Sequence, residues 1–86
     1  MTTKVRTFSL LRYVDAALQL VEYDRDDDGV VLAIIPGASG FYAQGDTFEE
    51  ARTNLRDVIE GNVLLALQLG LPIPVIPGVP IEEQHA

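Results

Sequence analysis

The chain has 86 residues, no cysteine and a formal charge of −7, so it fits one small domain without disulfides or a thiolate metal site. Its acidic balance argues against direct nucleic-acid binding, which needs a basic face, and suits either a basic protein partner or solubility alone. No apolar run can span a bilayer and no signal peptide is recognisable, so we expect a cytoplasmic protein without membrane contact.

The first elements are short. Residues 1–7 are polar and expected to be loose. Ser9 can cap a short helix over residues 10–17, because apolar residues recur on one side of that segment. Residues 18–24 alternate in polarity and predict a strand of mixed faces, although continuation of the helix through Leu20 is an alternative.

A meander of strands follows. Residues 25–29 are rich in aspartate and end in Asp-Gly, a strong signal for a hairpin turn. Gly29 tolerates positive φ, so the turn itself is expected to need no charge. Residues 30–35 are apolar on both faces and predict a central strand, and residues 41–44 predict the next one. Short turns between these strands imply antiparallel pairing.

A long helix starts after Thr47. Thr47 lies three residues before Glu50, which is the spacing of a capping box between a side-chain hydroxyl and a glutamate. Apolar residues then recur with a period of about 3.6 residues, as on one face of a helix. Gly70 and the prolines after it stop the helix. We therefore expect a helix over residues 48–69 that packs one stripe on the sheet.

The C-terminal segment is rich in proline. Residues 71–81 cannot donate a continuous ladder of hydrogen bonds, so we expect an extended chain and at most a fourth, edge strand. Residues 82–86 are expected to be disordered. The predicted fold class is α+β: a three-stranded antiparallel meander with one long helix packed on it and a short N-terminal helix. We expect one domain over residues 1–86, with a structured core at 9–76.

The second half of the long helix is almost entirely apolar, whereas one sheet can bury only one stripe of it. Large apolar patches rarely stay exposed on monomers. We therefore expect a homodimer or a higher homo-oligomer, and the predicted interface contains Val63, Leu64, Leu67 and Leu71.

The acidic turn is the strongest candidate for a binding surface. Asp24, Asp26 and Asp28 precede Gly29 as in the first half of a calcium loop, but Ile35 stands where the closing glutamate belongs. A solvated turn and an acidic tip that faces a partner are the other interpretations. No catalytic triad, phosphate loop or base-stacking platform is recognisable. We expect no metal, no cofactor and no enzymatic activity.

The order of these motifs resembles the HicB-like antitoxin family. The resemblance covers residues 18–75 and includes Ile35-Pro36-Gly37, the sequence GDTFEEA at Gly45–Ala51, the long helix and Leu71-Pro72-Ile73-Pro74. It implies a partial RNase H-like fold without catalytic carboxylates. It also implies a partner, a small basic RNA-cleaving toxin of the HicA type, which the antitoxin would bind and inhibit.

The resemblance also directs attention to the acidic surface. The candidate toxin-binding residues are Asp24, Asp26, Asp27 and Asp28 at the turn, and Glu49 and Glu50 at the start of the helix. Many family members carry a C-terminal DNA-binding extension. None is recognisable here, so no direct nucleic-acid binding by this chain is expected. The alternative function is a solitary homo-oligomeric structural or adaptor module with no toxin partner.

Overall fold

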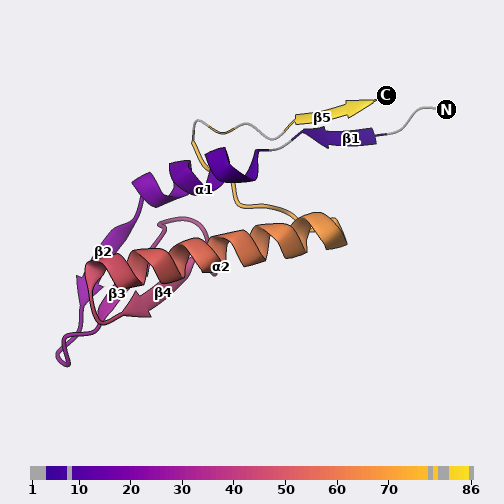
Figure 1. Ribbon diagram of the computed structural model, residues 1–86. Coiled ribbons are helices and arrows are strands. Elements are labelled where there is room, and N and C mark those ends of the chain that lie inside the picture. The colour runs from indigo at the N-terminus through magenta and orange to yellow at the C-terminus, as the bar shows by residue number, and fades with distance from the viewer. Residues whose placement is uncertain (1–3, 8, 78, 80–81, 86) are drawn as a thin grey trace.

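The computed structural model describes residues 4–7, 9–77, 79 and 82–85. Figure 1 shows its elements, which in chain order are β1 (Lys4–Thr7), α1 (Leu10–Gln19), β2 (Glu22–Arg25), β3 (Val31–Ile34), β4 (Tyr42–Gly45), α2 (Phe48–Leu69) and β5 (Glu82–His85). Strands β2, β3 and β4 form an antiparallel sheet in that order, and β1 pairs with β5 in a separate two-stranded ribbon. The predicted α+β fold, with a long helix on a three-stranded meander, is confirmed.

Helix α1 starts as predicted but runs further than predicted. The Arg12 N–H donates a hydrogen bond to Ser9 Oγ at 3.3 Å, so Ser9 caps the helix. The prediction of a strand from residue 18 is wrong, because Leu18 lies in α1 and is fully buried, and β2 starts only at Glu22. Burial of an apolar side chain in the core outweighs a short alternation in polarity.

Helix α2 lies across one face of the sheet, and α1 packs beside it on the same side (Figure 1). Its buried stripe consists of Ala51, Leu55, Ile59, Val63 and Ala66. Val31, Ala33 and Ile35 are buried on the facing side of the central strand. Because side chains alternate along a strand, Leu32 and Ile34 point to the other face of the sheet. Ile34 is 39% exposed there.

The chain after α2 turns back to the body of the molecule. Ile73, Ile76 and Val79 are buried. The hydroxyl of Tyr13 in α1 donates a hydrogen bond to the carbonyl oxygen of Pro74, 2.5 Å away, and this contact ties the segment to α1. In the described part of 71–81, only an isolated bridge between Ile76 and Val79 has strand character, so the possible fourth strand does not form there.

The expectation of loose or disordered ends is wrong for the residues that the structure describes. Lys4–Thr7 and Glu82–His85 pair in register, with Lys4 opposite His85 and Thr7 opposite Glu82. Pairing between the two ends of the chain depends on backbone hydrogen bonds, so neither segment shows a sequence pattern from which the pairing could be predicted. Residues 1–3 and 86 lie outside the described residues. In Figure 1 this ribbon extends away from the rest of the molecule. Within the described residues, neither helix is long and apolar enough to cross a bilayer.

Candidate functional site

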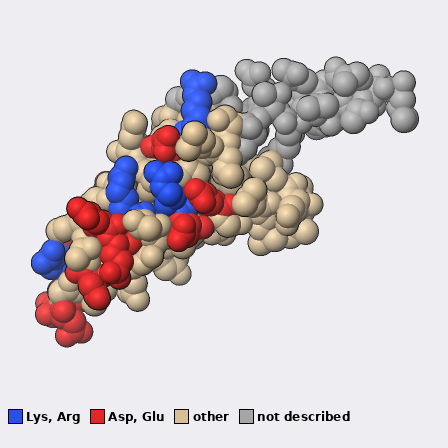
Figure 2. Space-filling view, viewed as in Figure 1, with Lys and Arg blue, Asp and Glu red and all other residues tan. Residues whose placement is uncertain are grey.

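Two acidic segments, the β2–β3 turn and the β4–α2 junction, lie at the same end of the strands. Arg25 pairs with Val31, and Val31 pairs with Gly45, so the β2–β3 turn and the β4–α2 junction both continue from this row. We define the acidic end as the carboxylates of Asp24, Asp26, Asp27, Asp28, Asp46, Glu49 and Glu50. Figure 2 shows acidic side chains gathered at this end of the molecule, down to the tip of the turn. The six residues predicted from the sequence as a toxin-binding surface therefore lie at one end.

The turn is shaped by a carboxylate as well as by glycine. Asp26 Oδ1 accepts hydrogen bonds from the N–H groups of Asp28 and Val30, both at 2.9 Å. Gly29 has the expected positive φ of 82°. Glycine alone therefore does not complete the turn, because the Asp26 side-chain oxygen occupies two backbone donors that the turn leaves without strand partners. An asparagine oxygen could accept the same two bonds, so the expectation that the turn needs no charge stays a prediction.

The carboxylates of the turn differ in whether they accept hydrogen bonds from the backbone. Asp24 Oδ1 accepts from the N–H of Arg25 at 2.8 Å, so it also faces the backbone. Asp27 is exposed and makes no hydrogen bond or ion pair to the described residues. No three acidic, histidine or cysteine side chains among the described residues are arranged to hold a metal ion. The carboxylates of Asp27 and Asp28 are both exposed and make no hydrogen bond or ion pair to the described residues, so they are the ones in the turn most available to a partner.

The start of α2 is held by hydrogen bonds of the Thr47 and Glu50 side chains. Thr47 Oγ1 accepts from the N–H of Glu50 at 3.0 Å, which confirms the predicted cap. Glu50 Oε1 accepts from the N–H of Asp46 at 3.3 Å, one residue before the position expected for a capping box. Glu50 is thus engaged in the fold, whereas Glu49 is exposed and makes no hydrogen bond or ion pair with the part of the chain that the structure describes.

An aromatic contact joins the start of α2 to β2. The rings of Tyr23 and Phe48 meet edge to face, with their centroids 5.3 Å apart. The guanidinium of Arg25 lies 5.0 Å from the centroid of the Phe48 ring. These contacts fix the position of Glu49 relative to the turn, and Arg25 is a cation placed among the acidic residues.

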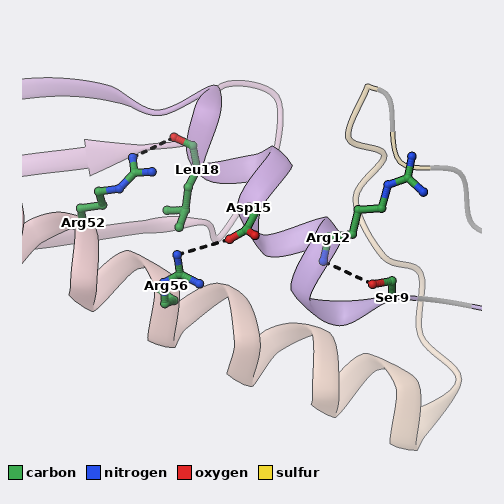
Figure 3. Close-up of polar contacts among 6 residues, drawn as sticks. All are labelled: Ser9, Arg12, Asp15, Leu18, Arg52 and Arg56. Atoms are coloured by element: carbon green, nitrogen blue, oxygen red, sulfur yellow. Dashed lines mark hydrogen bonds and ion pairs between the residues drawn. The ribbon is translucent and has the colours of Figure 1, made fainter.

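Two arginines of α2 are directed to α1 instead. Arg52 Nη1 donates to the carbonyl oxygen of Leu18 at 3.1 Å, and Arg56 Nη2 lies 3.4 Å from Asp15 Oδ1 (Figure 3). Their spacing of four residues, which places them on one side of α2, is the signal that could have indicated a shared partner. Because they bind α1, they leave the acidic end largely unneutralised.

The residues predicted for an oligomer interface differ in their exposure to solvent. Val63 is 1% exposed and belongs to the core, so the prediction is wrong for this residue. Leu67 is partly buried against the core, while Leu64 and Leu71 are 48% and 47% exposed. An apolar segment without a polar face gives no indication of which side chains point inward.

A groove of about 170 Å³ lies at the C-terminal half of α2. Its walls come from α2, from the segment after α2, and from the chain around β4, and they include Phe41, Asn62, Leu65, Leu71, Ile73 and Pro74. The lining residues are apolar except for Ser39 and Asn62, and the Asn62 amide already donates to the carbonyl oxygen of Val58 at 2.8 Å. The groove therefore suits an apolar side chain.

Similarity to known proteins agrees with this fold. A family model described as UPF0150-like matches residues 12–74. The chain belongs to the UPF0150-like family. The UPF0150 protein ssr1258 from Synechocystis sp. is 40% identical over 37 residues, which cover 43% of this chain and 54% of that protein. The chain thus spans about half the length of this curated relative.

A similar fold is found in a solved structure, that of TTHA0281 from Thermus thermophilus. This crystal structure superposes with a TM-score of 0.76 and 28% sequence identity, covering 88% of this chain and 96% of TTHA0281. The match to the UPF0150-like family spans the turn, β4 and the whole of α2. It therefore includes every residue of the acidic end.

Proposed function

We propose that this chain is an antitoxin-like protein that binds and inhibits a small basic RNA-cleaving toxin of the HicA type, as in a type II toxin–antitoxin system. The observation that carries the proposal is the gathering of carboxylates from two separate segments at the acidic end. The resemblance of Gly45–Ala51 and its flanking motifs to HicB-like antitoxins supplies the kind of partner.

The proposed inhibition is binding without catalysis. A small RNase that cleaves RNA has to present a cationic surface to the phosphates of its substrate. An acidic surface on the inhibitor attracts that same cationic surface and speeds the encounter. Asp27 and Glu49 are candidates for direct contact, one from each acidic segment, because both carboxylates are exposed and not engaged within the described fold. Asp26 and Glu50 keep the two segments in shape.

An inhibition assay tests the proposal. The candidate toxin to be tested would be the product of any neighbouring reading frame that encodes a short basic protein with one histidine. We expect an excess of this chain to stop RNA cleavage by that product. The variant Asp27→Asn/Glu49→Gln should require a higher concentration for the same inhibition. The control variant Asp57→Asn/Glu60→Gln loses the same charge from a part of α2 outside the acidic end and should behave like the parent. Undiminished cleavage at saturating excess of the parent chain would refute the proposal.

The second candidate function is a homo-oligomeric structural or adaptor module without a toxin. The exposed leucines near the C-terminus of α2 favour it, namely Leu64, Leu65, Leu69 and Leu71. The inhibition assay distinguishes the two functions, because a module of this kind would leave the RNase active while it self-associates.

A further inference from the structure

The outer face of the main sheet, on the side away from α2, is covered by neither helix (Figure 1). Because side chains alternate along a strand, Leu32 and Ile34 of β3 point to this face, and the register sets Tyr42 of β4 beside Ile34. Ile34 is 39% exposed and Tyr42 is 61% exposed. We define the outer stripe as Leu32, Ile34 and Tyr42. Apolar side chains grouped in this way on a sheet indicate a surface that packs against another element.

Carboxylates line one side of the outer stripe. In the strand register, Glu22 of β2 lies opposite Ile34, and Asp24 lies opposite Leu32, so both carboxylates belong to the outer face. The Glu22 carboxylate is exposed and makes no hydrogen bond or ion pair with the described residues. The other side of the stripe is uncharged, because Gln44 of β4 is the partner of Leu32.

No cation within β2, β3 or β4 offsets these two carboxylates on the outer face. Arg25 is the basic residue of these strands, and it points to the opposite face, where its guanidinium lies 5.0 Å from the centroid of the Phe48 ring. A second copy of this chain would bring the same carboxylates and a formal charge of −7, so repulsion disfavours it here. The outer face therefore suits a partner that is both apolar and cationic.

The spacing of these groups fits a helix. Alternate residues of a strand are about 6.7 Å apart, and residues four positions apart in a helix are separated by about 6 Å along its axis. Apolar residues at positions i and i+4 of a helix can therefore cover Leu32 and Ile34, while lysine or arginine at the same spacing on its flank meets Glu22 and Asp24. Strands β2 and β4 are about 10 Å apart, which is close to the diameter of a helix.

We propose that the outer face binds a basic amphipathic helix of another protein, which lies along β3 with its apolar side on the outer stripe and its cationic flank on Glu22 and Asp24. The sheet then has helices on both faces, so its apolar residues are covered on both sides. This inference goes beyond the proposed function, because it follows from the sheet alone and does not require the partner to be an RNase. A negative result in the inhibition assay leaves it standing.

Two synthetic peptides of leucine and lysine serve as probes for this contact. One has its leucines on one side of a helix, and the other has the same composition in an order that distributes them around the helix. Both have the same charge, so their attraction to the acidic end is equal. We expect the first peptide to bind the full-length chain about tenfold more tightly and to shift the backbone amide resonances of β2, β3 and β4. Equal affinities, or shifts confined to α2 and the segment after it, would overturn the proposal.

Matched variants test the contact with the first peptide. Ile34→Lys places a cation in the outer stripe and should weaken binding about tenfold. Val75→Lys adds the same charge to the segment after α2, at a side chain that is 88% exposed, and should bind like the parent. Glu22→Gln should weaken binding about threefold at low salt, the size of an exposed ion pair, whereas Asp57→Asn on α2 should not.

Folding is verified by circular dichroism, and the exposed position of Glu22 keeps Glu22→Gln informative even where Ile34→Lys fails to fold. Parent-like affinity of Glu22→Gln or of folded Ile34→Lys would overturn the proposal. Equal weakening by Val75→Lys and Asp57→Asn would do the same, because it would show that net charge alone decides binding.

Discussion

Gly45 at the end of β4 approaches Ala51 in the first turn of α2 so closely that a Cβ atom on Gly45 would lie 2.6 Å from the Ala51 backbone nitrogen. The obstructing atoms belong to the backbone of α2 and cannot rotate away. We expect Gly45→Ala to lower the free energy of unfolding by about 1–3 kcal/mol, as overpacking does.

Gly61 provides the matched control for Gly45. It lies within α2, and a Cβ atom there would meet nothing within 4 Å. Gly61→Ala should raise the free energy of unfolding by about 0.5–1 kcal/mol, because alanine is a better helix former. Urea unfolding of both variants measures the two changes. Equal shifts in one direction would contradict the close approach at Gly45.

The cap of α2 should contribute measurably to stability. Thr47→Ala removes the hydroxyl that accepts from the Glu50 N–H, and loss of such a cap costs about 1 kcal/mol. In a domain of this size, the melting temperature should fall by roughly 4–8 °C. A scanning calorimetry trace that matches that of the parent would show that the hydroxyl does not stabilise the helix.

The two adjacent aspartates at the turn should differ in their effect on stability. Asp26→Ala leaves the N–H groups of Asp28 and Val30 without their acceptor and should cost about 1 kcal/mol, less than for a buried group since water can replace it. Asp27→Ala should change the free energy of unfolding by less than about 0.5 kcal/mol. Chemical denaturation of the two variants tests this, and similar losses would contradict the assigned turn geometry.

Tyr13 should make the fold sensitive to alkaline pH. Burial raises the pKa of Tyr13 to about 12, whereas an unfolded tyrosine ionises near pH 10. The unfolded chain therefore releases this proton first as the pH rises, so the stabilisation is complete below about pH 10 and is lost progressively between about pH 10 and 12. Tyr13→Phe should flatten this part of the profile of unfolding free energy against pH. Parallel profiles for parent and variant would contradict the prediction.

Local sequence signals were sufficient for the centre of the fold. The Thr47 to Glu50 spacing located the start of α2, and Gly29 marked the turn, because capping and positive φ are decided by a few consecutive residues. The packing of α1 on α2 was not predictable in this way. Leu18 lies in α1 and is fully buried in a core that distant segments of the chain help to form, and no pattern within residues 18–24 contains that information.

The candidate site was predictable in composition but only partly in geometry. The acidic residues are evident in the sequence, yet their meeting depends on the strand register that sets Arg25, Val31 and Gly45 in one row. Which carboxylates are free also depends on tertiary structure, since Asp26 is engaged by the backbone and Asp27 is not. The assignment of Val63 to an interface failed because helical periodicity is not visible where nearly every residue is apolar.

The association rate with the candidate RNase, measured by stopped flow across a range of ionic strength, tests most directly whether the acidic end binds a basic partner. We expect the rate for the parent chain to fall steeply as salt increases, because steering by opposite charges is screened. Asp27→Asn/Glu49→Gln should associate more slowly at low salt and with a shallower dependence, while Asp57→Asn/Glu60→Gln should follow the parent. Identical rates and salt slopes for the parent and Asp27→Asn/Glu49→Gln would contradict the role assigned to the acidic end.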